Sequence, residues 1–122
     1  MIKLTSVLSA LVLAGPFTLA AGDWPQFRGV NGSGIASGTE PLPTEFSAES
    51  KVLWQAELGD GIGSPVIVAG RVFNTALVGE KSFVVFCHEA ATGKELWKRE
   101  LPAGELPRIT PPNSHASSTA AA

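Results

Sequence analysis

Apolar residues from position 52 onward fall into short runs that are separated by turn-forming residues. Five runs predict β-strands, at residues 52–58, 64–69, 71–78, 82–88 and 95–101. Runs of this kind about ten residues apart, bounded by glycine-rich turns, are typical of an antiparallel all-β fold. The stretch at residues 83–86 is continuously apolar, which predicts a strand that is buried on both faces. Turns are expected at Gly70-Arg71 and at the polar pair Glu80-Lys81.

The pattern changes before this strand-rich part. Residues 22–51 hold many glycines and prolines without a helical or alternating apolar period, which predicts an extended N-terminal segment. Residues 1–21 have the pattern of a signal peptide, because Lys3 precedes an uncharged apolar stretch and Thr18-Leu19-Ala20 presents small residues to a signal peptidase. We therefore expect cleavage at or just after Ala20, export to the periplasm or the extracellular space, and no membrane span after cleavage.

Composition narrows the class of protein without identifying a function. The chain of 122 residues carries 9 Lys and Arg against 11 Asp and Glu, a net charge of −2. It therefore lacks the basic excess typical of proteins that bind nucleic acid. Its 13 glycines and 9 prolines disfavour a helical bundle, because both residues destabilise helix interiors. Its single cysteine excludes an intramolecular disulfide and a cysteine-rich zinc site.

One hexamer occurs twice in the chain. Leu-Trp-Gln-Ala-Glu-Leu at residues 53–58 returns as Leu-Trp-Lys-Arg-Glu-Leu at residues 96–101, so four of six positions match at an offset of 43. A period of about 40 to 50 residues with several strands in each unit is the signature of a β-propeller blade, although other repeat arrays share such periods. The repeat region is then residues 52–122, with one full antiparallel four-stranded blade at about 64–101 and a second beginning at about 116.

The run between the last two predicted strands carries a family resemblance. Glu89-Ala90-Ala91-Thr92-Gly93-Lys94-Glu95-Leu96-Trp97 resembles the signature of pyrroloquinoline-quinone-like (PQQ-like) β-propeller repeats, with Glu89 in place of the usual Asp. The start of the extended segment, Asp23-Trp24-Pro25-Gln26-Phe27-Arg28-Gly29, is similar to that of exported bacterial members. The resemblance covers residues 23–122 and implies a structural repeat motif. Its members are Glu89, Thr92, Gly93, Trp97 and, through the repeated hexamer, Trp54.

Elementary chemistry supports the motif locally. Gly93 can adopt the positive φ that a tight turn often requires, and the Thr92 hydroxyl can bond to nearby backbone. Trp97 can bury a large surface while its indole N–H finds a partner. In the family this tryptophan docks against the neighbouring blade, and the same docking is implied for Trp54.

The resemblance also implies that more blades exist than the sequence holds. Propellers have about 4 to 8 blades, whereas residues 52–122 supply one closing strand, one blade and the first residues of another. We therefore expect this chain to be the N-terminal fragment of a longer protein. In complete family members an N-terminal strand often completes the last blade, and the strand around Trp54 would have this role.

Two classes of function follow from the resemblance. The first is a non-catalytic exported scaffold for protein interaction or assembly, since relatives help to assemble outer-membrane proteins. Its partners would be other exported or envelope proteins, and no catalytic, cofactor-binding or metal-binding residue is expected in this segment. The alternative is the N-terminal part of a PQQ-dependent dehydrogenase, which would use PQQ and calcium. No residue here can be assigned the calcium-ligand, cofactor-clamping or base roles of such enzymes, which favours the scaffold.

The other candidate residues have ordinary structural interpretations. Cys87 and His88 are neighbours on a predicted strand and point to opposite faces, which predicts a core thiol and a surface imidazole rather than a shared metal ion. His115 follows Ser114, but adjacency does not make a catalytic triad, and a solvated loop is expected. The glycine-rich residues 29–34 lack the strand-then-helix context of a phosphate-binding loop.

Overall fold

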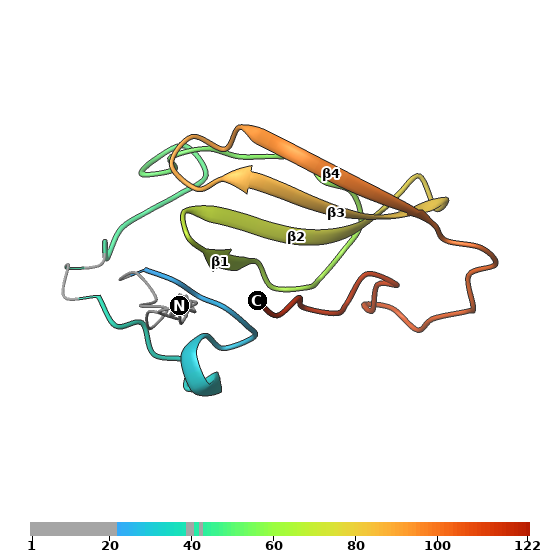
Figure 1. Ribbon diagram of the computed structural model, residues 1–122, viewed down its shortest axis with the longest axis horizontal. Helices are drawn as coiled ribbons and strands as arrows, with labels where there is room; N and C mark the ends of the chain where they lie inside the picture. Colours follow the sequence, from blue (N-terminus) through green and yellow to red (C-terminus); the bar gives the residue numbers. More distant parts are fainter. Residues whose placement is uncertain (1–21, 39–40, 42) are drawn as a thin grey trace, which may run out of the picture.

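Four strands form one antiparallel sheet in the computed structural model, which describes residues 22–38, 41 and 43–122 (Figure 1). The strands are β1 (Val66–Val68), β2 (Arg71–Val78), β3 (Ser82–Glu89) and β4 (Glu95–Pro102), and they are neighbours in chain order. The described residues contain one helical element, the three-residue 3-10 turn η1 (Val30–Gly32). The predicted all-β class is confirmed. The predicted signal peptide at residues 1–21 lies outside the described residues.

The strand predictions differ in their outcomes. The prediction for 71–78 is confirmed exactly, and those for 82–88 and 95–101 are confirmed with one further residue each. The strand predicted at 64–69 shortens to the three residues of β1. The prediction of a strand at 52–58 is wrong, because no backbone ladder pairs with these residues in the described part of the chain.

The hairpin turns have the backbone twist that suits right-handed sheets. The loop between β1 and β2 has two residues, Ala69-Gly70, and the loop between β2 and β3 has three, Gly79 to Lys81, with Gly79 and Glu80 at the centre of its turn. The four residues at the centres of the two turns have positive φ, at 49°, 71°, 58° and 56°. Positive φ at both central positions is the mark of the type I′ turn, which matches the twist of the flanking strands. The predicted turns at both places are confirmed.

The core of the sheet lies along β3 and β2. Ala76, Val84 and Phe86 form a buried cluster on one face, and Leu58 packs against it from the segment before β1. On the opposite face Cys87 is completely buried. Residues 83 and 85 are half-buried, so the expected burial on both faces of β3 is confirmed only toward its C-terminal end.

The outer strand contrasts with this core. Every residue of β4 is exposed, including Leu96, Trp97 and Leu101 at 44%, 40% and 62%. Exposed apolar side chains on an edge strand are the kind of surface that a neighbouring sheet or chain covers.

The two ends of the described chain meet beside β1. Trp24 exchanges backbone hydrogen bonds with Ile67 on the free edge of β1. The C-terminal segment runs alongside the residues that lead into β1, where the Ile62 N–H donates to the Ala116 carbonyl at 3.2 Å. Figure 1 shows both segments next to the short strand. They extend the contacts of the sheet without adding a strand to it.

Candidate functional site: the tryptophan docking contact

The turn between β3 and β4 is held by its own polar groups. The Glu89 and Lys94 backbones approach each other at its base, where the Glu89 N–H donates to the Lys94 carbonyl at 2.9 Å. The Thr92 hydroxyl donates to the Glu89 carboxylate at 2.5 Å and accepts from the Lys94 N–H at 3.2 Å. Gly93 has a φ of 73°. The expected roles of Thr92 and Gly93 in a tight turn are therefore confirmed.

Trp54 docks onto this turn from outside the sheet. Its indole N–H donates to the Ala90 carbonyl at 2.8 Å. Its ring covers Gly93 so closely that a Cβ atom there would lie 2.5 Å from the nearest ring carbon. The ring also stacks on His88, with the centroids 6.0 Å apart and the planes inclined by 25°. We call this arrangement the Trp54 docking contact, formed by Trp54 with residues 88–93.

Trp97 occupies the matching position of the second hexamer but has different surroundings. It lies opposite Cys87 in the β3–β4 register and meets Phe73 at a centroid distance of 6.0 Å. Because side chains alternate between the faces of a strand, Cys87 and His88 point to opposite faces. Trp97 therefore shares the face of Cys87, whereas Trp54 covers the face of His88. Among the motif residues, Gly93 meets the Trp54 ring, Glu89 and Thr92 hold the turn that carries Gly93, and Trp97 lies apart from that contact.

The prediction that His88 is a surface imidazole is wrong. His88 is 5% exposed and lies between the rings of Trp54 and Phe86, with both ring pairs at 6.0 Å. Its strand position puts it on the face of the buried core cluster. The segment at 52–58 then folds over that face and excludes solvent. The sequence of β3 alone could not predict that His88 is buried, because the covering side chain, Trp54, lies more than thirty positions earlier in the chain.

Cys87 is buried as predicted, and its chemistry follows from that burial. Loss of solvation raises the pKa of the Cys87 thiol above its ordinary value, and the positive charge of Arg71 offsets part of the rise. Thiolates are the reactive form of cysteine, so a buried protonated thiol is inert.

A pH-dependent contribution to stability follows from this shift. The unfolded thiol ionises above about pH 8.5 while the folded thiol stays protonated, so its contribution is complete below that pH and is lost as pH rises through the folded pKa. We expect the difference in free energy of unfolding between the wild type and Cys87→Ala to narrow between pH 7.5 and pH 10, as measured by urea titration. Parallel curves for the two proteins would contradict a raised pKa.

Ser114 and His115 lie in a loop but are less solvated than expected. Ser114 is buried and donates its hydroxyl proton to Asp60 Oδ2 at 2.8 Å. The half-buried His115 donates from Nε2 to the Pro107 carbonyl at 2.7 Å. The predicted loop is therefore confirmed for the backbone. The prediction that its side chains are solvated is wrong, because the hydrogen bonds to Asp60 and to the Pro107 carbonyl draw Ser114 and His115 inward. The two side chains are engaged with different partners, so this is not the nucleophile and base pair of a hydrolase.

In the part of the chain that the structure describes, no three His, Cys, Asp or Glu side chains are grouped closely enough to hold a metal ion. The same part of the chain contains no helix of the length and hydrophobicity needed to cross a membrane. The glycine-rich residues 29–34 form the η1 turn, and Gly29 packs against the Trp24 ring.

In comparisons with known proteins, no family model matches this chain, and neither a curated protein nor a solved structure does. The PQQ-like resemblance therefore depends on the sequence motifs alone.

Proposed function

We propose that this chain is the N-terminal part of an exported, non-catalytic PQQ-like propeller protein that serves as a scaffold for protein interaction or assembly. The observation that carries the proposal is the Trp54 docking contact. A tryptophan from outside the sheet covers Gly93 and donates to the Ala90 carbonyl in the turn of that sheet. Repeat folds build their cores through such contacts between neighbouring units.

The repeated hexamer extends this contact into an array. Trp54 and Trp97 hold equivalent positions in the two hexamers, and Trp97 keeps 40% of its surface exposed on an exposed edge strand. In the proposed array Trp97 docks onto the corresponding turn of a following blade, as Trp54 docks here. The exposed apolar side chains of β4 are then covered by that blade.

The engagement of the polar groups favours a scaffold over an enzyme. Glu89 and Thr92 bond to each other within the turn, and Asp60 accepts from Ser114. The Nε2 of His115 bonds to the Pro107 carbonyl. These side chains order loops and turns, and none of them forms a pair of catalytic groups poised on a shared reactant position.

The proposed repeat array is tested by making the same substitution, Trp97→Ala, in this chain and in a longer protein that contains the following repeats. Trp97→Ala is expected to lower the free energy of unfolding by less than about 1 kcal/mol in this chain, where the ring is exposed. In a longer native protein carrying the following repeats it should cost about 3 kcal/mol, the usual cost of removing a buried aromatic ring. Equal small losses in both contexts would refute the repeat array.

The scaffold is tested on the same longer protein. Purified protein should not reduce a dye acceptor with alcohols or sugars, with or without added PQQ and calcium. Acceptor reduction that appears only when both cofactors are added would establish the dehydrogenase alternative instead.

A further inference from the structure

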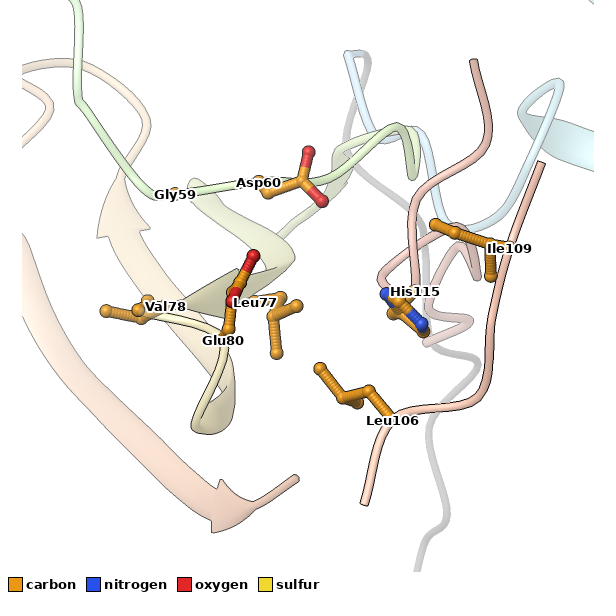
Figure 2. Close-up of a pocket in the computed structure, with 9 residues that line it drawn as sticks. Gly59, Asp60, Leu77, Val78, Glu80, Leu106, Ile109 and His115 are labelled. Carbon is orange, nitrogen blue, oxygen red and sulfur yellow. The ribbon is translucent and has the colours of Figure 1, made fainter. Parts of the chain in front are cut away.

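A cavity of about 450 Å³ lies at the end of the sheet where β2 turns into β3. Figure 2 shows it between two walls, with Asp60, Leu77 and Glu80 on one side facing Leu106, Ile109 and His115 on the other. The first wall consists of the end of β2, the β2–β3 turn and the segment before β1, which pairs with Leu77 at Asp60, and the second belongs to the connection after β4. A volume of this size is typical of pockets that hold small molecules.

The polar side chains that line the cavity can accept hydrogen bonds. Asp60 and Glu80 contribute carboxylates. His115 uses Nε2 to donate to the Pro107 carbonyl, so in its neutral form the other ring nitrogen is an acceptor. No lysine or arginine lines the cavity among the residues that the structure describes. The cavity therefore carries negative charge that its own lining leaves without a positive partner.

The Asp60 carboxylate is held in place by the fold. Its backbone pairs in both directions with Leu77, at 3.0 and 2.7 Å. The buried Ser114 donates to its Oδ2 at 2.8 Å, and the Ala116 N–H in turn donates to the Ser114 hydroxyl. One carboxylate oxygen thus has a fixed protein donor, and this bond joins the two walls of the cavity. An ordered carboxylate binds a ligand with less loss of side-chain freedom than a mobile one.

The apolar side chains of the lining favour a cation that carries an apolar group over a bare metal ion. Leu77, Leu106 and Ile109 bound the same space as the two carboxylates. A bare metal ion would leave these side chains without a contact, and the described residues hold no metal-binding group. A ligand with several N–H donors and a short alkyl chain matches both the carboxylates and the apolar side chains of the lining. We propose that this cavity binds a small organic cation, an alkylguanidinium or alkylammonium.

This inference does not rest on the proposed scaffold function. In an antiparallel meander the β2–β3 turn lies at the opposite end of the sheet from the β3–β4 turn, so the cavity is remote from the Trp54 docking contact. Substitutions at the cavity therefore leave that contact intact, and failure of one proposal does not entail failure of the other.

The test is calorimetric titration of the whole chain with butylguanidinium and butylammonium, with butyrate and butanol as charge controls. We expect the two cations to bind with a Kd of about 1 mM or tighter. Asp60→Asn should weaken binding about tenfold, since it removes the charge and keeps an oxygen that accepts from Ser114. Glu80→Gln, on an exposed turn, should weaken it about two- to fivefold. Raising the salt concentration should weaken binding by the wild type.

Glu105→Gln is the matched control, because Glu105 is an exposed carboxylate of the same connection that does not line the cavity. Its affinity should equal that of the wild type. Circular dichroism verifies that each variant remains folded, and the exposed Glu80→Gln variant keeps the test decisive if Asp60→Asn unfolds. The proposal is overturned if neither cation binds, if butyrate or butanol binds equally well, or if Glu80→Gln and Glu105→Gln both match the wild type.

Discussion

Gly93→Ala is expected to destabilise the chain by about 3 kcal/mol, from steric clash and backbone strain together. An alanine Cβ would lie 2.5 to 2.7 Å from three carbons of the Trp54 ring, closer than real Cβ contacts. The ring must move, so it loses its stacking on His88 and its bond to the Ala90 carbonyl. The φ of 73° adds a cost of about 1 to 2 kcal/mol for any residue with a Cβ. Urea unfolding of the variant and the wild type measures the sum.

Gly70→Ala separates the two causes. Gly70 has nearly the same φ, 71°, and a Cβ there would meet nothing within 4 Å. Its replacement should therefore cost only the backbone strain, about 1 to 2 kcal/mol. The excess loss in Gly93→Ala reports the Trp54 contact. Equal losses at both glycines would mean that the ring does not cover Gly93.

Trp54→Ala is the second substitution with a large expected effect, a loss of about 3 kcal/mol in the free energy of unfolding. It removes the hydrogen bond to Ala90 and uncovers Gly93 and His88. Trp54→Phe keeps most of the ring contact and loses the N–H donor, so it should cost about 1 kcal/mol. Denaturant titration followed by the far-UV signal of the sheet compares the three proteins without relying on the tryptophan that is removed.

A double-substitution cycle gives the sharper control. Once Trp54 is alanine, Gly93→Ala no longer meets a ring and should cost no more than Gly70→Ala. The two losses therefore should fall short of additivity by about 1 to 2 kcal/mol, as expected for residues in direct contact. Strict additivity would show that Trp54 and Gly93 act independently and would remove the support for the repeat array.

The Trp54 docking contact explains why the sequence correctly predicted the turn at Thr92 and Gly93 but wrongly predicted an exposed side chain at His88. The chemistry of Thr92 and Gly93 is local, so their hydrogen bond and φ follow from the residue types alone. The burial of His88 depends on Trp54, which is 34 positions earlier in the chain. Alternation along β3 assigns His88 to a face, but it does not say what covers that face.

The same distinction separates the two copies of the hexamer. The copy at 96–101 becomes part of β4 because the preceding tight turn places it against β3. The copy at 53–58 has four of the same six residues and forms no strand. A strand exists only when its backbone groups have a partner, so similar sequences have different structures when only one of them pairs with a neighbouring strand.

By itself, the sequence determined the all-β class, three of the strands to within one residue and the turns between them, because apolar runs and positive-φ turns act over a few residues. Only the tertiary structure decided that Trp54 covers the β3–β4 turn, that His88 is buried, and that Asp60 and Glu80 share a cavity with His115. These arrangements join residues that are far apart in the chain. Packing geometry sets such contacts, and the order of residues along one strand does not encode them.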